Sequence, residues 1–367
     1  SPPHPQFRRD LRPATHSAHH AARNPWTERW RKYWTEAGQA ANHDISDNVD
    51  SCDRIGFSLT ETEHTYKMKT ISLFTGAGGL DVGLEQAGFE VRLAVEIDRW
   101  AQETLELNRA AFRDPGFQIL GDITGYEPEE ILSTAGLAAG EATLVAGGPP
   151  CQSFSTAGRR GSIGDPRGSL FANFAAVVRV AKPRFFVMEN VRGILSAPIK
   201  HRPLTERGEN FPPLEPEEQQ GSAFRVILDE LEGLGYQLTY GLVDAADYGV
   251  PQNRLRVIVL GSRDKEFKSR DINAVVPPTH TGHWLSLRDA LQNLNGGPPE
   301  FVPYSAERER ILALVPPGHN WRWFRDHPKY GQDFAAQLMG GAWGADGGRV
   351  GFFRRLTWDK PSPTLPT

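Results

Sequence analysis

Hydrophobic and polar positions follow two alternating patterns between residues 69 and 265. Short apolar runs, bounded by glycine, proline or acidic residues, are typical of buried strands, whereas apolar residues that recur every three or four positions are typical of amphipathic helices. The first pattern predicts strands at 70–74, 91–95, 117–120, 143–146, 185–188, 238–243 and 256–260. The second predicts helices near 80–87, 100–108, 171–181 and 223–234.

Strands that alternate with helices indicate a mostly parallel sheet covered by helices on both faces. We therefore expect an α/β domain at 68–270 with a doubly wound, Rossmann-like sheet. The Pro- and Glu-rich stretch 196–221 is expected to be a surface insertion in it. Residues 271–367 lose the periodicity and predict a smaller, loop-rich part. Residues 1–67, with several prolines and histidines, predict a poorly ordered arm.

Composition and charge limit the classes of protein. The 367 residues carry a formal net charge of −4, so contact with nucleic acid requires a local basic surface. Two distant cysteines, Cys52 and Cys151, cannot build a disulfide framework and favour a reducing compartment. No apolar run approaches the roughly 20 residues of a membrane span, and no signal peptide pattern opens the chain. We expect a cytoplasmic protein without a membrane segment, and no metal site.

A glycine turn, residues 76–79, follows the first strand, at the position where open α/β sheets bind ligands. Asp81 stands where a dinucleotide motif has its third glycine, so a dinucleotide is disfavoured. Glu96 ends the second strand, twenty residues after Gly76, and a carboxylate there can accept ribose hydroxyls. Asp122 follows the third strand and can accept from an exocyclic amine. An adenosine-like ligand fits all three features; the alternative is that the glycines serve only helix–sheet packing.

Three further groups point to chemistry at the same sheet edge. Cys151 follows the fourth strand in a loop that two glycines and two prolines make rigid, Glu189 ends the fifth strand, and Arg254 and Arg256 lead into the last. A lone cysteine is usually an inert buried residue, and an arginine before a strand is often ordinary surface chemistry. The polar, constrained loop favours instead a reactive thiol close to a carboxyl group.

Taken together, these segments resemble the DNA cytosine-C5 methyltransferases. SLFTGAGGLDVGLEQAGF is similar to the block of that family that binds S-adenosyl-L-methionine, VEID and GDI to its next two cofactor blocks, and GGPPCQSFS to its nucleophile loop. DPRGSLF, ENV and QNRLRV follow in the order of the family. The resemblance implies a methyltransferase sheet with S-adenosyl-L-methionine as cofactor. The cofactor-binding residues it implies are Phe74, Gly76, Gly78, Gly79, Glu96, Ile97, Asp122, Ile123, Pro149 and Leu170.

The resemblance also implies the roles of the catalytic residues. Cys151 would attack carbon 6 of a cytosine flipped out of double-stranded DNA, and Glu189 would donate a proton to ring nitrogen 3. Arg256 would hold the cytosine O2 and position Glu189, and Arg254 would meet a backbone phosphate. Burial of Glu189 would favour the protonated carboxyl that this role needs.

Target recognition would then fall to residues of about 275–360, within the smaller part at 271–367. Residues 301–367 hold nine Lys and Arg against six Asp and Glu. The residues that suggest DNA contact are Arg308, Arg310, Arg322, Arg325, Arg349, Arg354, Arg355, Trp321, Trp323 and Trp343. The alternative is a solvated basic surface around core tryptophans.

Two blocks of the family, one with an RE.AR helix and one with a Gly-Asn pair, do not occur before Thr367. The chain is therefore expected to be cut short, or to be one subunit of a split enzyme that needs a second subunit. A cognate restriction endonuclease is a further candidate partner. Two other functions stay open: a transfer RNA cytosine-5 methyltransferase, and a non-catalytic partner that binds the cofactor.

Overall fold

The computed structural model describes residues 67–150, 170–264, 267, 271–292, 303–343 and 351–364. All of them belong to one compact unit, Thr65–Thr367. Three sequence expectations lie outside the described residues: the arm, Arg349 and the nucleophile Cys151 with the segment that follows it. No helix of the described part is both long and apolar enough to cross a membrane.

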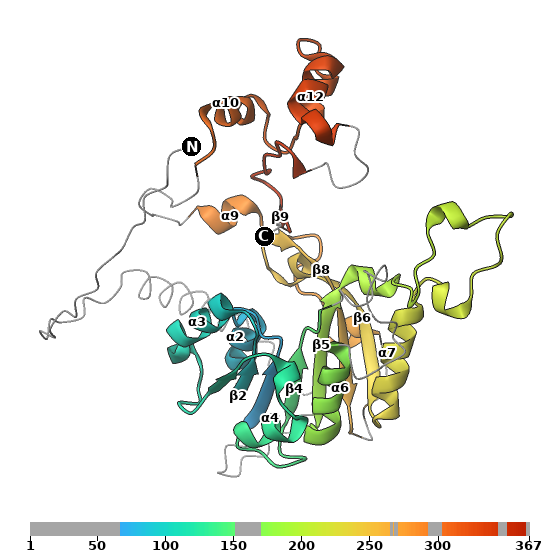
Figure 1. Ribbon diagram of the computed structural model, residues 1–367. Helices are drawn as coiled ribbons and strands as arrows, with labels where there is room; N and C mark the ends of the chain where they lie inside the picture. The colour runs from blue at the N-terminus through green and yellow to red at the C-terminus, as the bar shows by residue number, and fades with distance from the viewer. Residues whose placement is uncertain are drawn as a thin grey trace, which may run out of the picture. The chain divides into compact units, whose positions relative to one another are not determined.

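A seven-stranded sheet forms the centre of this unit (Figure 1). Its strand order is β3-β2-β1-β4-β5-β8-β6, in which β8 runs antiparallel to both neighbours and the other pairs are parallel. The predicted fold class, with its seven strands and mostly parallel sheet, is confirmed. The strands are β1 (Met68–Leu73), β2 (Phe89–Val95), β3 (Gln118–Leu120), β4 (Leu144–Gly147), β5 (Phe185–Val191), β6 (Gln237–Asp244) and β8 (Leu255–Ser262).

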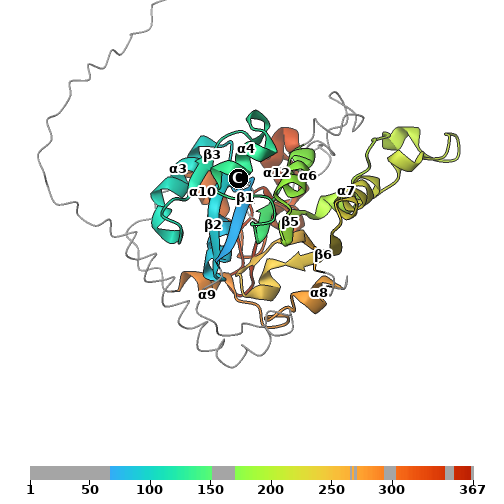
Figure 2. The same cartoon turned by 90° about the horizontal axis from the view of Figure 1, so that it is seen from below.

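Helices cover both faces of the sheet, and Figure 2 shows α6 and α7 on one side with α8 on the other. Four helices match the predicted ones: α2 (Gly79–Gln86), α3 (Arg99–Leu107), α6 (Leu170–Ala181) and α7 (Ser222–Gly233). The helices that were not expected include two short ones, α4 (Pro128–Thr134) and α8 (Ile272–Val275), and the part predicted to be loop-rich holds further helices at 287–291, 306–314, 322–326 and 331–339. Helix α4 starts with a proline and two glutamates, which favour a helix N-terminus, but its seven residues are too few for a clear period.

Two apolar clusters pack against the sheet. The larger joins β1, β2, β5 and β8 to α4, α6 and α7, with Phe174 and Phe186 fully buried in it. The smaller lies between β2 and α3 and contains Phe112 and Phe117, whose rings stack with centroids 4.1 Å apart. Burying one such side chain stabilises the fold by about 1.5–3 kcal/mol. Since each face has its own cluster, the sheet is held from both sides.

An ion pair between Arg202 and the buried Glu218 stabilises the predicted insertion. The Arg202 guanidinium also donates to the carbonyls of Pro212 and Pro213. At the base of the insertion, Ile199 N donates to Ser222 Oγ at 2.9 Å. Arg202 thus connects the middle of this segment to its end. The segment contains the 3-10 helices η6 (Leu204–Glu206) and η7 (Pro216–Glu218).

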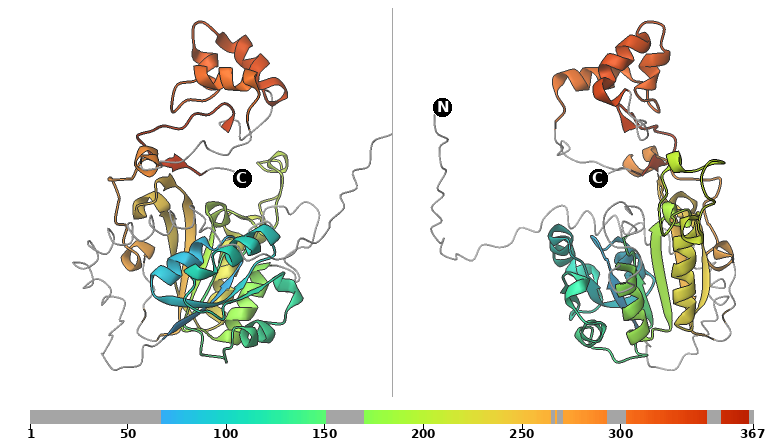
Figure 3. Two further views of the ribbon diagram at one scale, coloured as in Figure 1. Left: turned by 90° about the vertical axis from the view of Figure 1, so that its left-hand side faces the viewer. Right: turned by 45° about the vertical axis from the view of Figure 1, so that its right-hand side comes forward.

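Helices α10 (Ala306–Leu314), α11 (Arg322–Asp326) and α12 (Gly331–Met339) form a small helical unit (Figure 3). Its core contains Trp321 and Phe324, and Trp343 meets Trp321 edge to face with centroids 5.4 Å apart. Trp321 is therefore a core residue, as the alternative for this region proposed, and Trp343 is partly buried against it. Helix α9 (Leu287–Leu291) precedes this unit in the chain. Strand β9 (Ser362–Pro363) follows it and pairs with β7 (Gln252–Asn253).

Candidate functional site

The glycine turn begins where β1 ends. Phe74 has a left-handed backbone with φ 56°, which a bulky residue adopts only under strain, and Gly76 and Gly78 follow with φ 58° and 85°. Thr75 N donates to the Val95 carbonyl at 3.3 Å, and Gly78 N donates to the Thr75 carbonyl at 3.2 Å. The turn is thus held against the end of β2 and leads the chain into α2.

The glycines of the turn differ in the space around them. A Cβ on Gly78 would lie 2.8 Å from Leu105 Cδ2, whereas on Gly76 or Gly79 it would meet nothing within 4 Å. Gly78 is therefore needed for close packing against α3. Gly76 and Gly79 face open space, where a ligand can approach the backbone. The packing interpretation thus fits Gly78, and the ligand-binding interpretation stays a prediction for Gly76 and Gly79.

Glu96 lies directly against this turn, as its spacing predicts. Its Oε2 accepts from Gly76 N at 2.6 Å and its Oε1 accepts from Asp98 N at 2.8 Å. Glu96 N in turn donates to the Leu120 carbonyl at 3.0 Å, so hydrogen bonds connect the end of β1 to that of β2, and the end of β2 to that of β3. Each carboxylate oxygen keeps a second acceptor direction, which leaves room for a ribose hydroxyl.

The other expected cofactor residues near this edge fall into two groups. Asp122 and Ile97 are exposed, and Ile97 has 68% of its surface free, a large value for an isoleucine. Asp122 Oδ1 accepts from Thr124 N at 2.9 Å, while Ile123 is buried in the larger core cluster. The open glycine backbone, the exposed apolar side chain and the carboxylates fit an adenosine-containing cofactor.

A second cluster lies at the carboxyl end of β5, where Glu189 meets Arg256 of β8. Arg256 Nε lies 2.5 Å from Glu189 Oε1, in an ion pair whose side chains are 18% and 32% exposed. The antiparallel pairing explains the contact, because β8 starts beside the residue where β5 ends: Val191 pairs with Arg256. Glu189 is thus held by a guanidinium, but it is less buried than the sequence interpretation expected.

The loop that leads to Cys151 reaches this cluster. A Cβ on Gly148 would lie 3.0 Å from Glu189 Oε2, so the glutamate carboxylate rests on the loop backbone. Asn190 is buried and its Nδ2 donates to the Pro149 carbonyl at 2.9 Å. Asn190 belongs to the ENV motif, whose sequence pattern indicated no role for the amide side chain. Pro149 is buried here, and Leu170, at the start of α6, packs against the larger core cluster.

The segment that carries the two arginines is fixed by Asp244. Asp244 Oδ1 accepts from Arg254 N at 2.8 Å and from Ala246 N at 3.2 Å, and Oδ2 accepts from Asn253 Nδ2 at 3.2 Å. From the other side, Thr364 Oγ1 donates to the Asn253 carbonyl. Arg254 itself is exposed and Arg256 is partly buried. Sequence reasoning missed Asp244, since an aspartate at a strand end usually only starts a turn.

These contacts form one sheet edge with two clusters, the glycine turn with Glu96 and the Glu189–Arg256 pair. Between them stands the junction of β1 and β4, where the strand order reverses and α/β proteins bind ligands. The fold and this edge define a doubly wound α/β protein in which a glycine turn and an acid–arginine pair share the sheet edge.

A family model described as C-5 cytosine-specific DNA methylase matches residues 68–298, and the chain belongs to this family. The Type II methyltransferase M.Sau96I of Staphylococcus aureus is 31% identical over 299 residues, which cover 80% of this chain and 60% of that protein. M.AquIA of Picosynechococcus sp., also a Type II methyltransferase, is 41% identical over 258 residues, 68% of this chain and 89% of that protein. The chain thus spans less than two thirds of M.Sau96I but most of M.AquIA.

Among solved structures, a prophage-encoded E. coli protein described as a DNA modification methyltransferase matches with 27% identity and a TM-score of 0.45. The match covers 64% of this chain and 56% of that chain.

Proposed function

We propose that this protein methylates carbon 5 of cytosine in double-stranded DNA, with S-adenosyl-L-methionine as the methyl donor. The observation that carries the proposal is the Glu189–Arg256 ion pair, which lies against the loop leading to Cys151 in a chain of the C-5 cytosine-specific DNA methylase family. An acid and a guanidinium beside a cysteine loop are the groups that attack on a pyrimidine ring needs.

Carbon 5 of cytosine is a weak nucleophile, so a temporary bond at carbon 6 must raise its electron density. In the proposed reaction the Cys151 thiolate forms this bond. Glu189 donates a proton to ring nitrogen 3, which keeps negative charge from accumulating on the ring. Arg256 holds O2 of the base and orients Glu189, and a base seated on this pair would cover the exposed part of the carboxyl group.

The cofactor residues proposed are Phe74, Gly76, Gly78, Gly79, Glu96, Ile97, Asp122, Ile123, Pro149 and Leu170. When bound, S-adenosyl-L-methionine supplies a methyl group from a sulfonium. Glu96 accepts the ribose hydroxyls, and the backbone of Gly76 and Gly79 lets the ligand approach closely. Loss of the carbon-5 proton and of Cys151 then restores the aromatic ring.

A base inside a stacked duplex cannot reach these groups, so we propose that the target cytosine is flipped out, at a cost of a few kcal/mol. Arg254, exposed beside the pair, would meet the adjacent phosphate. The small helical unit would hold the duplex. It has a basic pocket of about 430 Å³, whose lining includes Tyr304, Arg308, Phe353, Arg354 and Arg355. Within the unit, Arg355 donates to the Val315 carbonyl and Arg325 pairs with Asp326, so these two also have structural roles.

The test is a covalent trap. Bisulfite sequencing of DNA from cells that express the gene with its neighbouring reading frames first identifies the modified context. Duplex DNA with 5-fluorocytosine at that position should then form an adduct that survives denaturation, because fluorine replaces the carbon-5 proton whose loss would release Cys151. Cys151→Ala should abolish the adduct, and Glu189→Gln should lower turnover far more than cofactor affinity. An adduct with Cys151→Ala would reject the role of this thiol.

The same assay separates the alternatives. Methylation of transfer RNA but not of DNA would support the RNA enzyme, and cofactor binding without either activity would support a non-catalytic subunit. A second subunit and a cognate endonuclease stay proposals, as does a cytoplasmic location. Adding the product of an adjacent reading frame would show whether the chain needs a partner.

A further inference from the structure

A buried carboxyl group lies beneath the glycine turn, and the proposed chemistry does not use it. Asp81, in the first turn of α2, is 0% exposed, and its Oδ1 accepts from Ser72 Oγ at 2.5 Å. Thr75 Oγ1 donates to the same Ser72 oxygen at 3.0 Å. A chain of two hydrogen bonds therefore runs from the turn to the carboxylate.

The second oxygen of this carboxyl group, Asp81 Oδ2, is buried and has no hydrogen-bond partner among the described residues. Removing such an acceptor from water costs free energy that no contact here recovers. An apolar residue would not incur this cost, so helix α2 does not need an aspartate for its packing. A buried, half-satisfied acid beside a ligand crevice is a candidate for a functional role.

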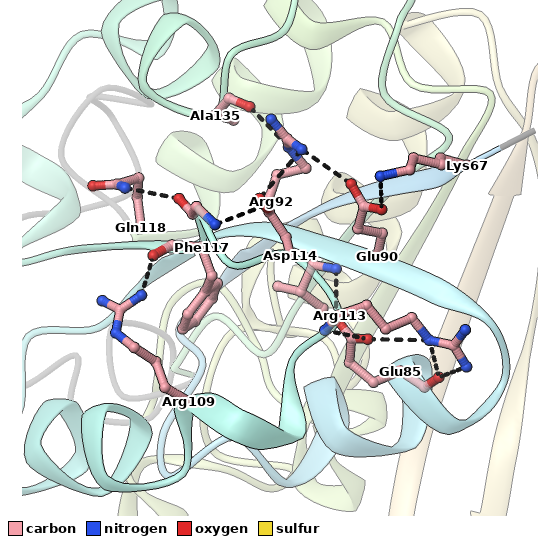
Figure 4. A network of polar contacts seen from close by, with 12 residues as sticks. Lys67, Glu85, Glu90, Arg92, Arg109, Arg113, Asp114, Phe117, Gln118 and Ala135 are labelled. Carbon is pink, nitrogen blue, oxygen red and sulfur yellow. Dashed lines mark hydrogen bonds and ion pairs between the residues drawn. The ribbon is translucent and has the colours of Figure 1, made fainter.

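The charged groups on the elements around Asp81 are mostly engaged with one another, and Figure 4 shows several of these contacts. Glu85, one turn further along α2, accepts from the backbone N–H groups of Val91 and Arg113. Its negative charge repels that of Asp81. On β2, Glu90 pairs with Lys67 and Arg92. No cation of the described residues contacts Asp81.

We propose that Asp81 is a positioning residue for the cofactor: through Ser72 and Thr75 it fixes the glycine turn, and its negative charge favours a cationic ligand above the turn. The inference rests on the proposed function, since S-adenosyl-L-methionine carries a sulfonium. Thr75 is the link to the backbone, because its carbonyl accepts from Gly78 N and its own N–H is held by β2. Either protonation state of the carboxyl group can accept from Ser72, but only the ionised carboxylate attracts a cation.

Ionisation of Asp81 thereby couples cofactor binding to pH. Burial, together with the charge of Glu85, raises the pKa of Asp81 to about 7 in the free protein. A bound cation stabilises the carboxylate and lowers that pKa. Binding therefore releases a proton near pH 7, and the affinity falls as pH falls below this value.

Isothermal titration calorimetry of the full chain with S-adenosyl-L-methionine, between pH 6 and 8 and in two buffers, tests this coupling. The wild-type protein should bind several-fold more weakly at pH 6 than at pH 8 and release up to about half a proton at pH 7. Asp81→Asn keeps an acceptor for Ser72 but cannot ionise, so it should lose both effects. The amino group of the ligand titrates in both proteins and cancels in this comparison.

Two further variants separate positioning from charge. Thr75→Val cuts the hydrogen-bond chain without touching the acid, so it should weaken binding at every pH and keep the pH dependence. Glu90→Gln is the matched control, a buried acid with its own ion pairs, and it should leave both unchanged. S-adenosylhomocysteine, which lacks the sulfonium charge, should show the smaller pH dependence.

The outcomes distinguish the two proposals. Equal pH profiles for the wild-type protein and Asp81→Asn, or equal profiles for the charged and uncharged ligands, would overturn the role of Asp81 while leaving the cofactor assignment intact. Failure of the wild-type protein to bind either ligand at any pH would overturn the cofactor assignment itself.

Discussion

At the scale of single residues, the site is built from side chains that bind backbone as much as they face a ligand. Glu96 holds two backbone N–H groups and Asn190 holds the carbonyl of Pro149. Such contacts keep a carboxylate or a loop in one position before a ligand arrives, which lowers the entropy lost on binding. The residues that orient the site therefore matter as much as those expected to touch the substrate.

Asp81 should make the free energy of unfolding depend on pH in the opposite direction to the cofactor affinity. Its pKa rises from 3.8 to about 7 on folding, so folding favours the protonated group. The stability that it contributes is complete below about pH 4 and is lost as pH rises through 7. Asp81→Asn should therefore be more stable to urea unfolding than the wild-type protein at pH 8, by about 4 kcal/mol, and equally stable at pH 4. A variant no more stable than wild type at pH 8 would contradict this account.

The sequence predicted part of the residue-level picture. Glu96 at the turn follows from a spacing of twenty residues, whereas Glu189 near Arg256 was implied only by the resemblance to the methyltransferase family. The links Asp81–Ser72 and Asp244–Arg254 were not predicted, because they depend on side-chain directions inside turns that no period reveals. Cys151, the proposed nucleophile, lies outside the described residues and stays a prediction.

At the scale of elements, the reversed strand β8 decides where the arginines lie. A parallel strand would start at the opposite edge, whereas β8 starts beside the end of β5 and so brings Arg256 to Glu189. Apolar periodicity located this strand but not its direction, since a buried strand has the same pattern in either direction. Helix α4 was not predicted because it is shorter than two turns and shows no clear apolar period.

The segment before β8 gives a prediction at this scale. Asp244→Ala removes the acceptor for Arg254 N, Ala246 N and Asn253 Nδ2, which should cost about 1–2 kcal/mol in urea unfolding and lower DNA-dependent turnover. Cofactor affinity should not change, since the glycine turn lies at other strands.

The matched control for this prediction is Asp271→Ala. Asp271 also accepts from a backbone N–H at a helix start, that of Asn273, but it caps α8 and has no contact with Arg254 or Arg256. It should lose comparable stability and keep full turnover. If both variants lost turnover equally, the segment held by Asp244 would have no specific role in the site.

At the scale of the whole molecule, a net charge of −4 opposes contact with DNA, so affinity has to come from local cations. Arg354 lines the basic pocket of the small helical unit and is exposed. Arg354→Gln should weaken DNA binding by a similar factor for all sequences and reduce the slope of log affinity against log salt by about one. Fluorescence anisotropy over a salt series measures this slope.

The control is Arg225→Gln, which removes an exposed charge of the same kind from α7. It should leave the slope unchanged, and an equal loss from both variants would mean that the pocket has no special part in binding. Composition predicted a basic region here and left open whether its tryptophans contact DNA or form a core. A core tryptophan and a DNA-binding tryptophan have the same sequence signal when no helical period surrounds them.

The edge-to-face pair of Trp321 and Trp343 also makes this part of the protein visible to spectroscopy. Two indoles 5.4 Å apart exchange excitation, so together they give a circular dichroism couplet that isolated indoles lack. The apolar clusters on the two faces of the sheet contain phenylalanine and tyrosine but no tryptophan. Loss of that optical signal would therefore report melting of the helical unit separately from melting of the sheet, within a single sample.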